Sequence, residues 1–482
     1  MESAIVAAVR AAGARRPEGI ALVSGGETLT YAELERRAAA AASHVAARAH
    51  GDIVGLLLPN TLAFVTNLLG ALWAGKTVAV LPTLAPPPLL QVMAAEAGLQ
   101  TILTSSDLAG RLAETKATPV ILDPAAATDP AEIQPRERTH PAAILLYTSG
   151  TTGRPKAVAL SDANILANAE GSRQAAGFGD DEVMLAILPL FHAFGLTVTL
   201  ILPLIQGCAV VLVERFIPRA VLNAIESHRV TSLVGVPSQY RLLTKEPTQA
   251  DTASLRFCIA GAERLPEQVA RDFEGRFSCP LLQGYGATEA SPVISLNPPR
   301  ANRPLSVGRP LPNVRVSLRE DGQEVAVGET GEIWVEGPNV MLGYHNRSQA
   351  TAEKLVEGAL RTGDRGYLDR EGYLHLAGRA DDLIKVAGEK VYPAEVEQAL
   401  ERIDGVEEAA VIGVPEEKHG AALRAFVQAR AGTTLTEAGL RAACRADLEA
   451  SKIPRSFVLL EQFPRTPSGK VDKRALAALE RS

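Results

Sequence analysis

The chain has 482 residues, of which 46% are hydrophobic and 22% charged, and 49 basic against 55 acidic residues give a net charge of −6. This composition is typical of a globular protein, and the length predicts two or three cooperating folding units. No run of lysine and arginine offers a footprint for DNA or RNA, so we expect no nucleic acid partner. The four cysteines are widely spaced without a CxxC pair, which argues against a zinc site and a disulfide scaffold.

The N-terminus lacks a basic segment followed by an apolar core, so we expect no secretory signal and a cytoplasmic protein. Residues 185–204 are long and apolar enough to be weighed as a membrane span. Two prolines, a histidine and a glycine interrupt this stretch, and three acidic residues precede it closely. We therefore predict a buried strand, loop and helix there, and no transmembrane span.

The first part of the chain alternates between strand and helix patterns. Thr30 and Glu33 have the spacing of a capping box and open an alanine-rich helix. A βαβ unit is predicted at residues 53–58, 64–74 and 77–81, and further strands at 102–105 and 120–123. Strands connected through helices form parallel sheets, which bind ligands at the carboxyl ends of their strands.

The remaining chain predicts three more units. A second parallel sheet is predicted from apolar runs at 183–188, 209–213, 232–236 and 255–260. Residues 307–336 alternate as a small antiparallel β-barrel would, and the region beyond 381 has the pattern of an independent α+β module. We therefore predict an α/β fold with a large N-terminal domain over residues 1–380, made of two helix-flanked parallel-type sheets and the small barrel, followed by a small C-terminal domain over 381–482.

Residues 145–156 read LLYTSGTTGRPK, an apolar run that turns into glycines and hydroxyl side chains and ends on lysine. Glycines let successive N–H groups approach an anion, and a lysine adds a mobile charge suited to phosphate. The spacing is not that of Walker A, so a kinase or GTPase gains no support. The candidate phosphate ligands are Thr148, Ser149, Gly150, Thr151, Thr152, Gly153 and Lys156.

Residues 147–156 resemble the phosphate loop of the AMP-forming adenylating enzymes, the superfamily of acyl-CoA synthetases, peptide-synthetase adenylation domains and luciferases. Two departures stand nearby: Ala157 replaces a family glycine, and residues 161–164 lack a histidine usual in relatives. The resemblance implies ATP as substrate and Mg²⁺ as its ion, with Thr151 as one metal ligand and a C-terminal domain that is mobile.

A second segment is GYGATE at residues 284–289. Its glycines and tyrosine suit close packing of a planar base, and Glu289 offers the hard oxygen that Mg²⁺ prefers beside phosphates. The segment resembles the family's GYGxTE motif, which implies that Tyr285 lies by the adenine and that Glu289 helps to hold the metal and is catalytic. The nucleotide ligands implied here are Gly284, Tyr285, Gly286 and Thr288.

A third group surrounds the predicted domain boundary. A carboxylate such as Asp364 is a natural acceptor for ribose hydroxyls, and Arg379 can add hydroxyl or phosphate contacts. The resemblance implies these two roles, makes Asp381 the hinge between domains, and places Lys385 and Gly388 on the path of coenzyme A. Ala387 stands where relatives often have serine or glycine.

The last motif is PRTPSGK at residues 464–470. It resembles the segment on which the family carries its adenylation lysine, which implies that Lys470 binds ATP and the acid and is catalytic. A cation placed against charge that develops at the α-phosphate is usually a large catalytic contribution.

The acyl pocket is predicted from small and aromatic residues. Small side chains admit a ligand and aromatic ones shape it, and the candidates are His192, Phe194, Val236, Ala260, Gly261 and Gly286. Gly261, Ala262 and Glu263 are also expected at the nucleotide. Relatives that activate amino acids carry aspartate near His192 to pair the amine, so an amino acid is disfavoured. The family's FHxxG histidine lies at the entrance for the acyl carboxylate, so the resemblance implies that His192 is a catalytic residue with a gating role, and we expect an apolar acid.

Together these features predict an ATP-dependent, AMP-forming acyl-CoA synthetase for a medium- or long-chain fatty acid, with a small-molecule acid, ATP and coenzyme A as its partners. One alternative is a stand-alone adenylation enzyme that loads an acyl or aryl acid onto a carrier protein. A non-catalytic nucleotide-binding homologue is the other, and it is disfavoured because Glu289, Asp364, Arg379 and Lys470 are all present. Homodimer formation, chain length and the thiol acceptor stay open.

Overall fold

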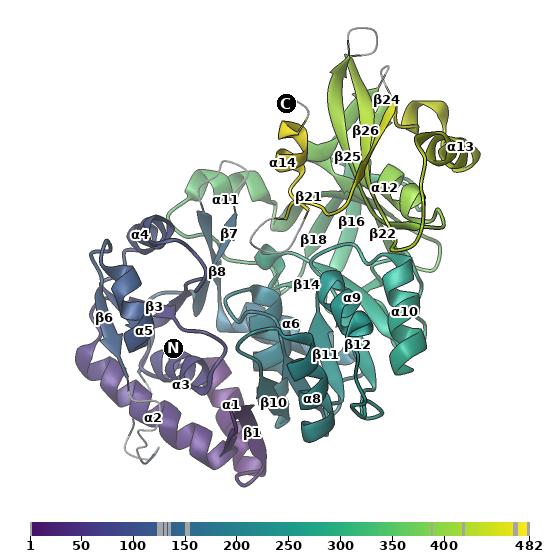
Figure 1. The fold of residues 1–482 in the computed structure, drawn as a ribbon. Helices are drawn as coiled ribbons and strands as arrows, with labels where there is room; N and C mark the ends of the chain where they lie inside the picture. The colour runs from purple at the N-terminus through teal and green to yellow at the C-terminus, as the bar shows by residue number, and fades with distance from the viewer. Residues whose placement is uncertain are drawn as a thin grey trace.

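The computed structural model describes residues 2–122, 129, 133, 136–149, 155–386, 389–416, 420–465 and 471–479. Two sheets flanked by helices and a third, antiparallel sheet form the large N-terminal domain, and a small α+β domain lies at its upper end (Figure 1). This architecture confirms the predicted fold class, and the unit predicted as a small barrel is a six-stranded antiparallel sheet.

The first sheet has seven strands in the order β19-β8-β7-β4-β3-β5-β6. Its central strands are parallel and almost fully buried, as expected for strands covered on both faces. The strands are β3 (Ile53–Leu57), β4 (Thr77–Val80), β5 (Thr101–Thr104), β6 (Thr118–Ile121), β7 (Ile144–Ser149), β8 (Pro155–Leu160) and β19 (Gly343–Tyr344). On its outer face pack α4 (Pro87–Glu96), α5 (Ser106–Ala109) and η1 (Gly110–Leu112).

The second sheet has nine strands in the order β15-β14-β13-β12-β11-β9-β10-β1-β2. Six neighbouring strands from β13 to β1 run parallel, and antiparallel strands extend both edges. The strands are β1 (Ile20–Ser24), β2 (Glu27–Thr30), β9 (Val183–Ala186), β10 (Ala209–Leu212), β11 (Ser232–Gly235), β12 (Phe257–Ala260), β13 (Leu281–Gly286), β14 (Val293–Leu296) and β15 (Arg309–Pro310). The outer face carries α8 (Pro218–His228), α9 (Pro237–Lys245) and α10 (Glu267–Phe277).

The main core lies between these two sheets and is filled by helices. They are α1 (Ala4–Arg15), α2 (Tyr31–Arg48), α3 (Leu62–Trp73), α6 (Asp162–Ala176), the π-helix η3 (Phe194–Ile201) and α7 (Leu202–Gln206). Sequence signals begin two of them: the Thr30 hydroxyl accepts a hydrogen bond from the Glu33 N–H, and Ser161 does the same for Asn164. The residues that replace the family histidine thus form the N-cap of α6.

The third sheet orders its strands as β17-β16-β18-β21-β20, with β22 paired to β21. The strands are β16 (Arg315–Glu320), β17 (Gln323–Glu324), β18 (Gly331–Glu336), β20 (Leu355–Val356), β21 (Ala359–Leu368) and β22 (Leu374–Arg379), and α11 (Ser348–Lys354) precedes β20. In the β21–β22 hairpin Asp364 pairs with Arg379 at the open end, and Leu368 pairs with Leu374 next to the turn. The two ends of this hairpin have different chemistry.

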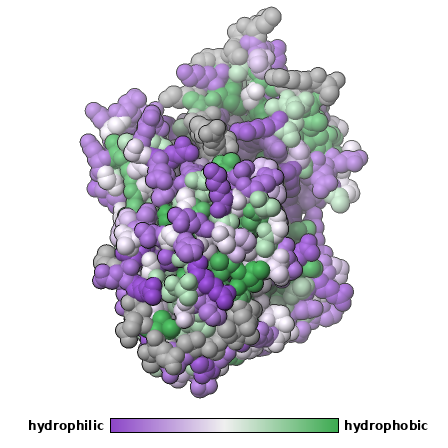
Figure 2. All heavy atoms as spheres, turned by 90° about the vertical axis from the view of Figure 1, so that its left-hand side faces the viewer, coloured by the Kyte–Doolittle hydropathy of each residue, from purple (hydrophilic) through white to green (hydrophobic). Residues whose placement is uncertain are grey.

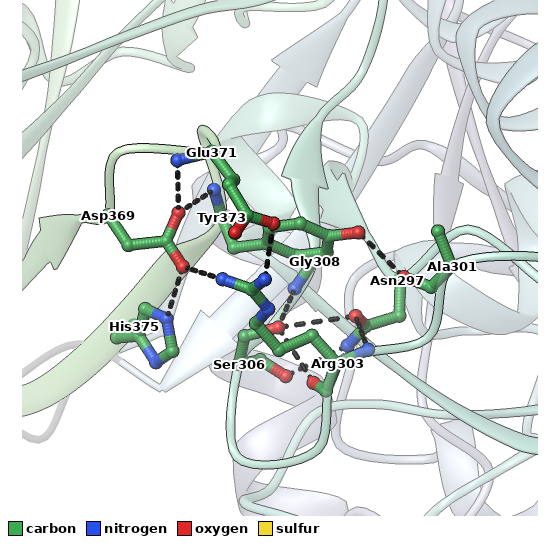
Figure 3. A network of polar contacts seen from close by, with 9 residues as sticks. All are labelled: Asn297, Ala301, Arg303, Ser306, Gly308, Asp369, Glu371, Tyr373 and His375. Carbon is green, nitrogen blue, oxygen red and sulfur yellow. Dashed lines mark hydrogen bonds and ion pairs between the residues drawn. The ribbon is translucent and has the colours of Figure 1, made fainter.

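At the turn of the hairpin, a polar network joins it to the loop over residues 297–308 (Figure 3). Arg303 donates to Asp369 at 2.5 Å and pairs with Glu371, and its guanidinium lies 4.4 Å from the Tyr373 ring centroid. His375 Nε2 lies 3.2 Å from the same Asp369 carboxylate. These contacts fix the turn, and through the hairpin register they fix the position of the open end.

The small domain begins after η5 (Ala380–Asp382) with the hairpin of β23 (Ile384–Val386) and β24 (Glu389–Val391). Its main sheet is β25 (Val406–Glu416), β26 (Gly420–Ala429) and β27 (Ser456–Leu460). The helices α12 (Pro393–Glu401), α13 (Glu437–Asp447), η6 (Ala450–Lys452) and α14 (Lys473–Ala478) pack around it, over two hydrophobic clusters of its own. The predicted boundary at 380–381 falls within η5 and stays a prediction.

Residues 185–204 span the end of β9, a loop, the π-helix and the start of α7, and most of them are buried in the main core. Across the part of the chain that the structure describes, no helix is long and apolar enough to cross a membrane. The face of the molecule seen in Figure 2 is mainly hydrophilic, with hydrophobic residues in small separate patches.

Candidate functional site

The predicted phosphate loop begins and ends on an antiparallel pair of strands. β7 and β8 pair with Thr148 opposite Lys156, so both side chains project from the same face of the sheet. Gly150, Thr151, Thr152 and Gly153 lie outside the described residues, and Ser149 is described only as part of β7. The strand pair thus places two of the predicted phosphate ligands, Thr148 and Lys156, directly opposite each other.

Tyr344 connects the phosphate-loop lysine to the predicted metal carboxylate. The Lys156 ammonium lies 5.2 Å from the Tyr344 ring centroid, and the Tyr344 hydroxyl donates to Glu289 Oε1 at 2.7 Å. Burial and the neighbouring Glu289 charge raise the pKa of the Tyr344 phenol, which therefore stays a donor. Tyr344 was not predicted, because its place depends on β19 pairing with the distant β8.

Asp364, Tyr285 and Arg379 form a second polar group beside the first. The Tyr285 hydroxyl donates to Asp364 Oδ2 at 2.5 Å, and Arg379 Nε lies 3.8 Å from Oδ1. Burial raises the pKa of Asp364, while the Tyr285 hydrogen bond and the positive charges of Arg379 and Lys354 lower it in part. The carboxylate therefore keeps unused acceptor capacity toward a ligand with hydroxyl donors.

Lys354, at the end of α11, is a further cation of this region that the sequence did not indicate. Its ammonium donates to the carbonyls of Arg361 and Thr362 at 3.2 and 3.1 Å. Gly363, with φ +81°, fits between two cations: an added Cβ would lie 3.4 Å from Lys354 Nζ and 3.6 Å from Arg379 Nη2. Burial lowers the pKa of Lys354, and the charges of Glu289 and Asp364 act against that shift.

The glycine-containing segments after β12 and within β13 meet at one sheet edge. These strands are parallel neighbours, with Ala260 opposite Gln283, so Gly261, Ala262 and Glu263 follow directly beside Gly284. Gly286 has no room for a side chain, because an added Cβ would lie 2.2 Å from the Pro292 carbonyl oxygen. Thr288 opens the short helix η4 (Thr288–Ala290), which also carries Glu289.

Two of the predicted acyl residues, Phe194 and Gly261, lie in tight contact. An added Cβ on Gly261 would lie 2.6 Å from the Phe194 ring, so the ring occupies the space that a larger residue would fill. Ala260 is fully buried, and Val236 follows the neighbouring parallel strand β11. His192 is exposed, and its ring lies 4.5 Å from that of Phe191. The apolar side chains are thus adjacent to the glycine segments of the nucleotide region.

The small-domain residues are only partly described. Lys470 and Gly388 lie outside the described residues. Lys385 is exposed on β23, and Asp381 lies in η5 between β22 and the small domain, where a hinge was predicted. The roles of all four residues stay predictions.

Glu289 is a suitable ligand for a divalent ion that also binds phosphate oxygens. Mg²⁺ in phosphate sites takes one or two carboxylates and completes its shell with substrate and water. The described residues contain no group of three or more His, Cys, Asp or Glu side chains that could hold a metal by themselves. A single carboxylate beside Lys156 therefore fits an ion that arrives with a polyphosphate.

Two protein-family models match the chain. Residues 9–345 match the AMP-binding enzyme model, and residues 395–470 match the model of the AMP-binding enzyme C-terminal domain. The first match spans more than half of the chain. The chain therefore belongs to the AMP-binding enzyme family, which confirms the resemblance drawn from its motifs.

Several similar proteins have names that specify an activity. A feruloyl-CoA synthase from an Amycolatopsis species is 36% identical over 469 residues, 95% of each chain. A long-chain-fatty-acid–CoA ligase from Bacillus subtilis is 38% identical over 347 residues, 70% of this chain and 61% of the relative. ATP-bound MatB from Rhodopseudomonas palustris has a TM-score of 0.91 at 30% identity, covering 100% of this chain and 99% of that one.

These comparisons confirm the prediction that the chain is an AMP-forming acid–thiol ligase, the class that includes the acyl-CoA synthetases. The relatives differ in the acid that their names specify, since others are named for sulfoacetate, oxalate and 2-succinylbenzoate. The comparisons therefore do not assign a particular acid to this chain.

Proposed function

We propose that the chain converts a medium- or long-chain fatty acid, ATP and coenzyme A into an acyl-CoA thioester, AMP and pyrophosphate. The observation that carries this proposal is the convergence of Lys156, Glu289, Asp364 and Arg379, which come from separate motifs and lie in one connected polar region through Tyr344, Tyr285 and Lys354. A nucleotide triphosphate needs cations at one end and hydroxyl acceptors at the other, and this region supplies both.

In the proposed binding mode, Lys156 and the loop before it hold the pyrophosphate end of ATP, and Asp364 accepts hydrogen bonds from the ribose hydroxyls. Tyr285 lies against the base and holds Asp364 in place through its hydroxyl group. Glu289 would hold Mg²⁺, which neutralises charge on the phosphate oxygens when it is bound. Tyr344 orients Glu289 through its 2.7 Å hydrogen bond.

The proposed reaction has two half-reactions. A carboxylate oxygen of the acid attacks the α-phosphorus, the bond to the β-phosphate oxygen breaks, and pyrophosphate leaves the acyl-adenylate behind. The thiol sulfur of coenzyme A then attacks the acyl carbon, the thiol proton is lost and AMP leaves. Lys470 would stabilise the first transition state, and rotation about Asp381 would then bring the Lys385 and Gly388 segment to the thiol.

Two features support an apolar acid. The first is an apolar wall next to Gly261, made of Phe194, Val236 and Ala260. The second is His192, which stands where an amino-acid-activating enzyme would need a carboxylate to pair with the amine. The similarity to a long-chain-fatty-acid–CoA ligase agrees with this choice, whereas the relatives named for ferulate, sulfoacetate and oxalate supply the competing acids.

The test is acid-dependent exchange of pyrophosphate into ATP over a panel of short, medium and long fatty acids, with ferulate, sulfoacetate and oxalate as competitors. We expect the highest kcat/KM with a medium- or long-chain acid and, after addition of coenzyme A, its thioester by mass spectrometry. Lys470→Ala should abolish most of the exchange. Pyrophosphate exchange with only one of the competing acids would overturn the proposal that the substrate is a fatty acid. Exchange without formation of a coenzyme A thioester would favour a carrier-protein thiol as the acceptor.

A further inference from the structure

Away from the nucleotide region, the two domains meet through side chains of opposite charge. The large domain contributes a basic face from α9 and the loop before α10, made of Arg241, Lys245 and Arg264, and the small domain an acidic edge from α12 and β25, made of Glu401, Glu407 and Glu408. Arg241 Nη1 lies 3.2 Å from Glu408 Oε2, and Lys245 Nζ lies 2.6 Å from Glu407 Oε1. Arg264 pairs with Glu401.

The acidic edge is well shielded from water in this arrangement. The side chains of Glu401, Glu407 and Glu408 are 10%, 15% and 13% exposed. A carboxylate removed from water is costly unless a cation or hydrogen-bond donor accompanies it. The basic face provides these cations only while the small domain keeps this orientation, so the pairs favour it over others.

Glu408 also contacts the base of the segment that carries Lys470. Arg465 Nη2 donates to Glu408 Oε2 at 2.6 Å, and Arg465 forms an antiparallel β-bridge with Val471. The two residues that enclose residues 466–470 are therefore bridged, and one of them is fixed to Glu408. Because Glu408 binds Arg241 at the same oxygen, the base of the segment is connected to the large domain through one carboxylate.

We infer that the acidic edge and the basic face hold the small domain in the orientation that forms the acyl-adenylate, with Glu408 as a positioning residue for the Lys470 segment. None of the six residues belongs to the nucleotide or acyl site, so they act on the reaction through domain orientation. The inference rests on the proposed function and on the adenylation role of Lys470. It adds that a specific set of ion pairs favours one half-reaction over the other.

The test separates the two half-reactions in the full-length enzyme, with the acid that gives the highest exchange in the panel. Lys245→Glu turns an attractive contact into a repulsive one at the surface of α9. We expect kcat/KM for pyrophosphate exchange to fall about tenfold, an effect typical of a charge pair reversed at an interface. Thioester formation from synthetic acyl-adenylate and coenzyme A should stay within about twofold, because that step needs the other orientation.

A charge exchange supplies the decisive control. Glu407→Lys alone should lower pyrophosphate exchange as Lys245→Glu does, and the double variant should recover to within about threefold of the wild type, because the pair is restored with opposite polarity. Arg315→Glu is the matched control, since Arg315 is 65% exposed and paired to Glu324 at 2.9 Å, compared with 63% exposure for Lys245. It should leave both half-reactions unchanged.

Equal losses in the two half-reactions, or a double variant no better than either single one, would overturn the inference and leave the proposed function standing. Loss of thioester formation alone would also overturn it, because the pairs would then favour the thiol-transfer orientation. Absence of exchange by the wild type with every acid would instead end the proposed function, and this inference with it.

Discussion

The two ends of the β21–β22 hairpin each carry an aspartate, and the two carboxylates have opposite electrostatic environments. Asp364 at the open end and Asp369 at the turn have side chains 20% and 21% exposed, so exposure does not distinguish them. Burial raises the pKa of Asp364, and its partners compensate only in part. For Asp369 burial acts in the same direction, but the Tyr373 and Glu371 N–H groups, His375 and Arg303 outweigh it and lower the pKa.

The difference indicates the role of each residue. The donors around Asp369 are in place within the protein and hold the turn together (Figure 3). Among the residues that the structure describes, Asp364 receives one short hydrogen bond, from Tyr285, and a longer contact with Arg379, which leaves acceptor capacity for a ligand that supplies donors. The fold thus satisfies the Asp369 carboxylate, whereas the environment of Asp364 agrees with the ligand role that we propose for it.

The largest expected effect comes from substituting Asp364, whose carboxylate has acceptor capacity left for a ligand. Asp364→Asn removes the carboxylate that we propose as the acceptor for the ribose hydroxyls. We expect kcat/KM for ATP to fall roughly 100-fold in the exchange assay, because the proposed charge-assisted hydrogen bonds are lost. Asp369→Asn should change the same constant less than about threefold. Equal losses in the two variants would show that the contrast between the hairpin ends has no functional meaning.

The same two variants should differ in their effect on stability. Asp369 has a lowered pKa in the folded protein, so its stabilisation is present above its unfolded pKa of about 3.9 and is lost as the pH falls through the lower folded value. Asp364 has a raised folded pKa, so its ionised form costs stability at neutral pH.

At pH 7 we therefore expect Asp369→Asn to lower Tm by a few degrees and Asp364→Asn to leave it equal or raise it. The Asp369→Asn difference should diminish as the pH falls below about 4, where the wild-type carboxylate begins to protonate in the unfolded state. Thermal unfolding of wild type and variants over a pH series measures this. A Tm loss for Asp369→Asn that does not change with pH would contradict the lowered pKa of Asp369 in the folded protein.

The smallest expected effect concerns Lys354, which contacts the backbone of β21 just before Asp364. Lys354→Met removes the donor to the carbonyls of Arg361 and Thr362, and we expect KM for ATP to rise about threefold to tenfold with kcat less affected. Lys354→Arg should recover part of the loss, since a guanidinium can donate to the same carbonyls. No change in KM for the methionine variant would mean that Gly363 holds its conformation without this cation.

The sequence was sufficient for the fold class and the family. Lys156, Glu289 and Asp364 became site candidates because each belongs to a short segment with glycines and polar side chains at a spacing that suits a nucleotide, and their roles stay predictions. The alternation of strand and helix patterns likewise predicted both parallel sheets, because apolar runs bounded by turns are local signals.

Tyr344 and Lys354 could not be found in the same way. Tyr344 reaches Glu289 because the two-residue strand β19 pairs with β8, far away in the chain, and Lys354 is one lysine at the end of a short helix. In the sequence, neither residue stands in a motif that would distinguish it from an ordinary surface tyrosine or lysine. Pairing between distant segments, and the ion pairs between the domains, depend on tertiary structure and leave no local pattern.

The contact between Phe194 and Gly261 has a consequence for which acids fit. A ring that lies where a methyl group would stand leaves no slack between the aromatic wall and the backbone of residue 261. A methyl group at 261 must therefore displace the ring, since the two cannot share that space. In the acyl site that we propose, residue 261 would thus control where the aromatic side chain lies, and with it the length of acid that fits.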